Sequence, residues 1–169
     1  DIIFESIYKL NAKGKKDIKY IFVPHEPSEN LIKKIECKLM ELDLSFCRYS
    51  NMNIANGETS IIIDKVGILP ELYKYSIISY IGCGFRKGVH NVIEPAAYGN
   101  LICFGPNYHI LNEAIEMVDN NLAYVVNTAD ELGNILNNIF KEDYLKQQSI
   151  LIKNYINSKS LSSNKIINE

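Results

Sequence analysis

Short apolar runs alternate with stretches of helical periodicity along the 169-residue chain. The apolar runs predict strands, because they are too short for helices and end at turn residues. These strands cover residues 18–23, 46–49, 61–64, 77–81, 101–104 and 123–126. Because most of them are separated by a helical stretch, crossover connections can bring them into parallel pairing. The sequence therefore predicts an α/β fold, a Rossmann-like three-layer domain with a mainly parallel sheet and helices on both faces.

The composition is that of an ordinary soluble protein. The sequence is 47% hydrophobic and its formal net charge is -2, which argues against disorder and against nucleic-acid binding. The four cysteines are widely spaced and form neither a zinc pattern nor a disulfide framework. There is no signal peptide and no apolar run of membrane-spanning length. We expect a cytoplasmic protein with reduced thiols, no bound metal and no cofactor.

The predicted helices follow from caps and apolar stripes. Ser28 is placed to cap one helix, and Thr128 with Glu131 forms a capping box for another. A final helix over residues 144–156 is interrupted by the serine-rich stretch 158–163, and we expect this tail, residues 144–169, to pack on another domain. The remaining helices are expected over residues 2–10, 68–75, around Glu94, and over 110–118.

The stretch 82–99 carries the chemistry that most constrains function. After an apolar strand, it presents three glycines with Arg86 and Lys87, and then a short helical segment that contains Glu94. Free backbone N–H groups at a helix start bind phosphate, and a carboxylate accepts hydrogen bonds from ribose hydroxyls. This combination suits a nucleotide. A glycine-rich turn can also serve only to pack a helix on a strand, and that structural reading stays open.

Other strand ends add candidate residues. His25 follows the first predicted strand, and Val66 with Gly67 follows the third. Because parallel strands present their carboxyl ends at one edge, we expect these residues and the 82–94 turn to share a rim. Val66 and Gly67 could wall a base pocket or be a packed strand end. His25 could serve a ligand or tie its turn together.

Three segments resemble the carboxyl-terminal domain of 3-deoxy-D-manno-octulosonic acid (Kdo) transferases. They are the run from Asp64 to Tyr73, the run from Gly88 to Ala96 with its His-Asn-x-x-Glu-Pro motif, and Phe104-Gly105-Pro106. Pro24-His25-Glu26 is similar to a Pro-His element of that family. The resemblance covers nearly the whole chain. It implies the donor-binding half of a two-domain GT-B glycosyltransferase that moves Kdo from CMP-Kdo onto a lipid A precursor in lipopolysaccharide biosynthesis.

The resemblance also implies roles for individual residues. Glu94 would hold the ribose hydroxyls of CMP, while Val66 and Gly67 would line the cytosine. Gly88, His90 and Asn91 would meet the phosphate, His25 would contribute to the donor site, and Arg86 or Lys87 would neutralise the departing CMP. No catalytic residue is expected within the chain.

Some positions depart from the family pattern. Many relatives have glycine where Val89 stands, methionine where Val66 stands, and an aromatic and a basic residue where Leu111 and Asn112 stand. The last difference concerns a contact to the carboxylate of the sugar that the resemblance implies.

The resemblance implies that a first strand and an amino-terminal domain precede residues 1–169, which form a single nucleotide-sugar-binding domain. That amino-terminal domain would supply the catalytic base, the acceptor site and the contact with the inner face of the bacterial inner membrane, so the fragment alone should be inactive. The alternatives are another GT-B glycosyltransferase, a nucleotide-sugar epimerase, or a non-enzymatic α/β binding module. A dinucleotide-binding domain is disfavoured because no G-x-G-x-x-G follows a first strand.

Overall fold

The structure is a computed structural model that describes residues 2–14, 18–51, 57–85, 87–138 and 141–166, with only the helix path over 160–166. The chain divides into two compact units, Asp1–Leu69 and Pro70–Glu169. Each unit contains one three-stranded parallel sheet, and the two are described separately below.

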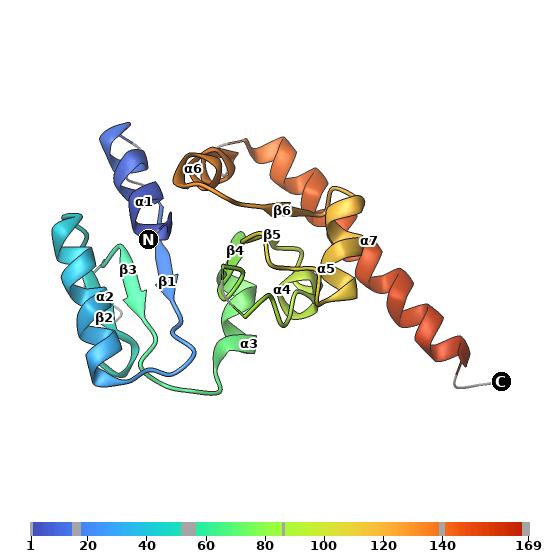
Figure 1. The fold of residues 1–169 in the computed structure, drawn as a ribbon, viewed down its shortest axis with the longest axis horizontal. Helices are drawn as coiled ribbons and strands as arrows, with labels where there is room; N and C mark the ends of the chain where they lie inside the picture. Colours follow the sequence, from blue (N-terminus) through green and yellow to red (C-terminus); the bar gives the residue numbers. More distant parts are fainter. Residues whose placement is uncertain (1, 15–17, 52–56, 86, 139–140, 167–169) are drawn as a thin grey trace. The chain divides into compact units, whose positions relative to one another are not determined.

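The sheet of the first unit has β3 (Ser60–Ile62) at its centre, between β1 (Tyr20–Phe22) and β2 (Phe46–Arg48). Two helices, α1 (Ile2–Ala12) and α2 (Glu29–Glu41), contribute to the hydrophobic cluster on one face of this sheet (Figure 1). The Phe4 ring of α1 stacks on Phe22 with centroids 5.6 Å apart, and Ile32 and Leu39 of α2 pack around Ile62. One shared cluster therefore holds both helices.

Polar contacts fix α2 within this unit. The predicted cap is confirmed, since the Ser28 side chain accepts from the Leu31 N–H. Arg48 of β2 reaches back to α2, where its Nε lies 2.7 Å from a Glu36 oxygen and its Nη1 lies 2.8 Å from Glu29. A short 3₁₀ turn, η1 (Tyr49–Asn51), follows β2.

The second sheet has the order β4-β5-β6, formed by Ile78–Ile81, Leu101–Phe104 and Ala123–Val125. All four residues of β5 are buried, as expected for the central strand of a parallel sheet. Helix α3 (Leu69–Leu72) and the 3₁₀ turn η2 (Tyr73–Tyr75) lead into β4. The later helices are α4 (Ile93–Ala97), α5 (Asn112–Asp119), α6 (Ala129–Asn137) and α7 (Glu142–Ile166).

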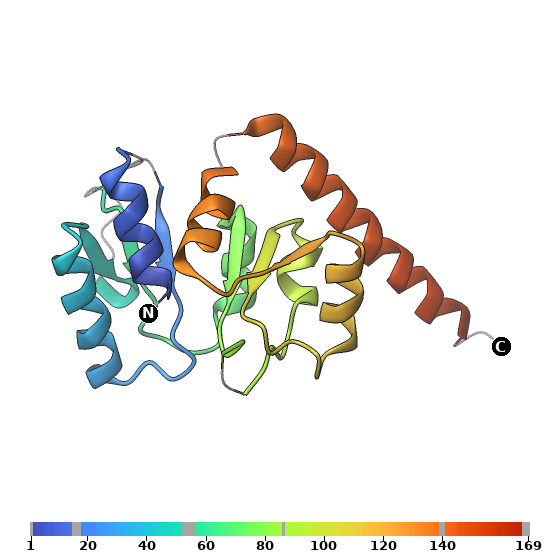
Figure 2. The ribbon, with the colours of Figure 1, turned by 45° about the horizontal axis from the view of Figure 1, so that its top comes forward.

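Helices α4, α5 and α7 pack around Ile102 and Phe104 of β5 (Figure 2). Ile152 of α7 is fully buried there, and the Tyr155 hydroxyl donates to a Glu116 carboxylate oxygen of α5 at 2.8 Å. Gly99 ends α4 at φ 76, where an added Cβ would meet the Ser149 side chain of α7. The long last helix is therefore part of the second unit's own core.

The α/β class and the parallel strand direction are confirmed. The expected interruption at 158–163 is wrong, because α7 continues through it, and serine is only moderately unfavourable within a helix. Whether the tail also packs on another domain stays a prediction. Of the helices in the described part, none combines the length and the apolarity that a bilayer crossing requires.

Candidate functional site

The loop after β4, residues 82–92, is held against the loop after β5. The Asn107 N–H donates to the Gly84 carbonyl at 2.8 Å, and the Val89 N–H donates to the Asn107 carbonyl at 3.1 Å. A further bond within the first loop joins the Gly88 N–H to the Cys83 carbonyl at 3.0 Å. Two strand ends thus form one hydrogen-bonded rim at the carboxyl edge of the second sheet.

Close backbone packing explains two of the glycines. A Cβ on Gly84 would lie 2.5 Å from the Gly105 nitrogen, and a Cβ on Gly105 would lie 2.6 Å from the Phe85 ring. No side chain fits in either place. Gly84 and Gly105 therefore serve packing, which is the alternative that the sequence left open for the glycine-rich turn. The sequence pattern could not show their contact, because it joins two separate loops.

Gly88 has a conformational role. Its φ is 96, in the left-handed region that disfavours other residues, and a Cβ there would lie 2.5 Å from the Ile110 side chain. The neighbouring Val89 is fully buried and takes no positive φ. The bend therefore depends on Gly88, and valine at 89 is compatible with it. Cys83 also has a positive φ, 68, which costs about 1–2 kcal/mol for an L residue.

The start of α4 differs from the expectation of free amides. The Asn91 Oδ1 accepts from the N–H groups of Ile93 and Glu94, at 3.1 and 3.3 Å, so the side chain of Asn91 already caps the helix. Within the described part of the chain, the N–H groups of His90 and Asn91 have no acceptor. Amides for an anion are thus found just before the helix and not in its first turn.

Glu94 lies in the first turn of α4 and is exposed, so it does not point into the core. Its carboxylate lies near the hydroxyl of Tyr73, a residue with only 8% of its surface exposed. Burial, and then the Glu94 charge, raise the pKa of the Tyr73 hydroxyl. This position leaves the carboxylate free to accept hydrogen bonds from a ligand.

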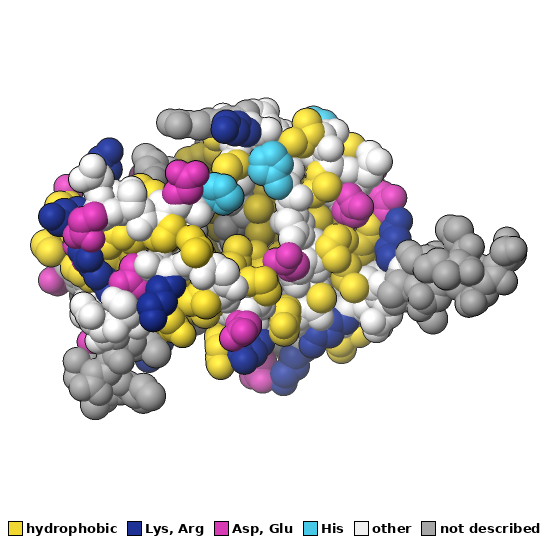
Figure 3. Space-filling model, turned by 90° about the horizontal axis from the view of Figure 1, so that it is seen from below, with side chains coloured by type: hydrophobic (Ala, Val, Ile, Leu, Met, Phe, Trp, Pro, Cys, Tyr) yellow, Lys and Arg dark blue, Asp and Glu magenta, His cyan; other side chains and the backbone are white. Residues whose placement is uncertain are grey.

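The cations and histidines of the rim are open to solvent. Lys87, His90 and His109 are exposed, and Arg86 lies outside the described residues. Figure 3 shows acidic, basic and hydrophobic side chains interspersed on one face of the molecule.

The first unit holds the other three predicted residues at its own carboxyl edge. His25 is exposed after β1, Val66 is 73% exposed after β3, and Gly67 takes φ 85. Asp64, between β3 and Gly67, accepts from the Ser50 N–H at 3.0 Å and from the Ser50 hydroxyl. Burial opposes the Asp64 charge, but these hydrogen bonds outweigh it and lower the pKa of the carboxyl.

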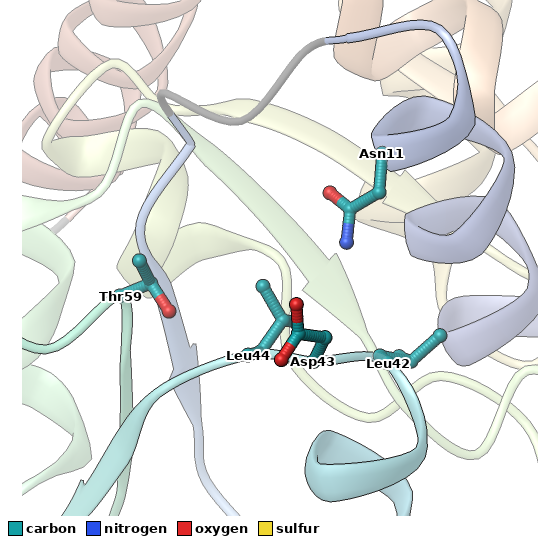
Figure 4. Close-up of a pocket in the computed structure, with 5 residues that line it drawn as sticks. All are labelled: Asn11, Leu42, Asp43, Leu44 and Thr59. Carbon is teal, nitrogen blue, oxygen red and sulfur yellow. The ribbon is translucent and has the colours of Figure 1, made fainter.

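A cavity of about 190 Å³ lies at the opposite edge of this unit. Figure 4 shows Asn11 of α1 pointing toward the turn between α2 and β2. Thr59, the residue before β3, also lines the cavity. The Thr59 hydroxyl is already used, since it donates to the Ser45 carbonyl at 2.8 Å. The cavity is separate from every predicted site residue, and ligands of open α/β sheets bind at the other edge.

Comparison with known proteins supports the reading of these motifs. The chain is 26% identical over 156 residues to the 3-deoxy-D-manno-octulosonic acid transferase of Rickettsia prowazekii. This alignment covers 90% of the chain and 33% of the relative. The chain is similar to Kdo transferases. The Aquifex aeolicus Kdo transferase is 31% identical over 113 residues, covering 66% of the chain and 30% of the relative.

A bifunctional glycosyltransferase/methyltransferase of Fusobacterium nucleatum is 26% identical over 170 residues, covering 93% of the chain and 26% of the relative. The chain thus spans a third or less of the length of these curated relatives. No protein-family model matches the sequence.

A solved structure shares the fold. The C-terminal CMP-Kdo binding domain of WaaA from Acinetobacter baumannii superposes with a TM-score of 0.69 at 19% identity. The superposition covers 88% of the chain and 82% of that domain. The predicted Rossmann-like α/β fold is therefore confirmed. The roles of individual site residues stay predictions.

Proposed function

We propose that this chain is the CMP-Kdo-binding domain of a Kdo transferase, a glycosyltransferase of lipopolysaccharide biosynthesis. The observation that carries the proposal is the agreement of two comparisons: Kdo transferases match along most of the chain, and a CMP-Kdo binding domain has the same fold. The exposed, hydrogen-bonded rim at the carboxyl edge of the second sheet supplies the place for the donor.

The phosphate and the ribose of the donor each have a counterpart on this rim. The N–H groups of His90 and Asn91 and the Lys87 ammonium face the phosphate, while Gly88 provides the bend that presents them. The exposed Glu94 carboxylate accepts from the ribose hydroxyls. When the glycosidic bond breaks, the positive charge of Lys87 or Arg86 stabilises the departing CMP.

The remaining residues belong to the first unit. Val66 and Gly67 are assigned to the cytosine and His25 to the donor site, and all three residues follow strands of the first sheet. The acceptor is a lipid A precursor, and the acceptor site, the catalytic base and any contact with the cytoplasmic face of the inner membrane reside in parts of the longer protein outside residues 1–169. Transfer by the 169-residue chain alone is not expected.

Calorimetric titration of the chain with CMP, UDP and GDP tests the donor class. The proposal expects CMP to bind more tightly than UDP or GDP, because the pocket for the base must distinguish cytosine from uracil and guanine. A clear preference for UDP would instead indicate another GT-B glycosyltransferase or an epimerase.

A matched pair of variants tests whether Glu94 binds the ligand. Glu94→Ala should reduce CMP affinity about tenfold or more, since hydrogen bonds to a charged group contribute about 1.5–3 kcal/mol. Its melting temperature should stay unchanged because the side chain is exposed. The control is Glu142→Ala, at an exposed position in the first turn of α7. It should leave CMP affinity unchanged and lower the melting temperature only slightly, because its exposed i,i+4 ion pair with Lys146 contributes about 0.3–0.5 kcal/mol. Lost stability with unchanged CMP affinity would assign Glu94 a structural role.

A further inference from the structure

The loop after β5 carries an exposed histidine in a fixed position. The His109 ring packs on Tyr108 with centroids 4.2 Å apart, and Tyr108 packs on Phe104 of the core with centroids 5.4 Å apart. Phe104 is fully buried. A chain of three aromatic rings thus supports an imidazole that is itself open to solvent.

The neighbours of His109 place it beside the phosphate-binding bend. Asn107 is hydrogen-bonded to Gly84 and Val89, and Ile110 lies against Gly88. Ile110 is 66% exposed and precedes α5, although the predicted helix over residues 110–118 included it. His109 therefore stands between two residues that contact the 84–89 bend.

The chemistry of an ulosonic acid requires a second anion site close to the phosphate. Its anomeric carbon bears both a carboxylate and, in the activated donor, the phosphate ester. The carboxylate must consequently lie near the residues that hold the phosphate. The residues at 111 and 112 cannot supply a cation here, since Leu111 packs toward the core and Asn112 is uncharged at the start of α5.

We propose that His109 binds the carboxylate of the donor sugar through an imidazole N–H. The proposal rests on the function given above, and it makes His109 a positioning residue that orients the anomeric carbon relative to the phosphate. A hydrogen bond to a carboxylate is among the stronger polar contacts, and a ring that already packs against a neighbouring ring loses little freedom when it binds.

The test compares two ligands, CMP and CMP-Kdo, on the 169-residue chain and its variants. His109→Ala should weaken CMP-Kdo binding about tenfold, the loss expected for one charge-assisted hydrogen bond at an exposed site, and leave CMP binding unchanged. His109→Lys should restore most of the CMP-Kdo affinity because it again offers a donor to the carboxylate.

The possible failures are distinguishable. If His109→Ala binds CMP-Kdo as tightly as the unaltered chain, or loses CMP and CMP-Kdo affinity equally, His109 does not hold the carboxylate and the donor-domain function stands. If the unaltered chain binds neither CMP nor CMP-Kdo, the proposed function is overturned and this proposal with it.

Discussion

Replacing Gly84 by alanine should separate the two loops that form the site. The added methyl carbon would lie 2.5 Å from the Gly105 nitrogen and 2.8 Å from its Cα. Both atoms are backbone, so no side chain can rotate away, and the loops must open by roughly an ångström to restore van der Waals contact. The same movement lengthens the bond from the Asn107 N–H to the Gly84 carbonyl, now 2.8 Å.

The expected loss of stability follows from these two effects. Overpacking of this kind costs about 1–3 kcal/mol. A weakened backbone hydrogen bond adds about 1 kcal/mol. Together they predict a loss of about 2–4 kcal/mol in the free energy of unfolding. With a urea m-value of about 1–3 kcal/mol/M, the unfolding midpoint should fall by roughly 0.7–4 M.

Gly82 provides the matched control within the same loop. A Cβ at Gly82 meets nothing within 4 Å, and its φ is not in the left-handed region. Gly82→Ala should therefore be neutral or stabilise by up to about 1 kcal/mol through the unfolded state. Urea denaturation of both variants, followed by circular dichroism, makes the comparison. Equal effects of the two substitutions would refute the backbone contact between the loops.

Three further predictions concern a cap, a carboxylate and a thiol. Thr128→Ala removes the side-chain acceptor that caps the start of α6, and should lower the free energy of unfolding in urea by about 1 kcal/mol. An unchanged free energy of unfolding would contradict this cap. The hydrogen bonds from Ser50 that lower the pKa of Asp64 stabilise the fold at neutral pH, and this stabilisation should fade as the pH falls below about 4. NMR titration of Ser50→Ala should show a higher Asp64 pKa than in the unaltered chain. Thiol labelling should be slowed by CMP at the exposed Cys83 and unchanged at the exposed Cys37, whereas equal protection would argue against binding at the rim.

Patterns that depend on neighbours in sequence predicted the local structure well. Leu101–Phe104 forms a strand with the predicted bounds because a continuous apolar run fits a position buried on both faces. The Ser28 and Thr128 caps formed as expected, since a cap needs only residues within one turn. At the start of α6, the Glu131 carboxylate accepts from the N–H of Asn127. Asn127 is one residue before the cap residue Thr128.

Features that depend on distant residues were not predictable. The predicted helix over residues 110–118 included Ile110, but α5 begins two residues later and Ile110 lies against Gly88 instead. The contact between Gly84 and Gly105 leaves no signal beyond two glycines in separate loops. The stretch 82–99 and Glu94 could be selected as a candidate site from residue chemistry, and their role stays a prediction. The capping of α4 by the Asn91 side chain left no signal in the sequence pattern.

A crystal structure of the chain with CMP bound would locate the donor site. The CMP phosphate should lie at the His90 and Asn91 N–H groups, and the ribose hydroxyls should lie within hydrogen-bond distance of the Glu94 carboxylate. CMP bound elsewhere, or bound with its ribose turned away from Glu94, would contradict the central claim that the rim of the second sheet is the donor site.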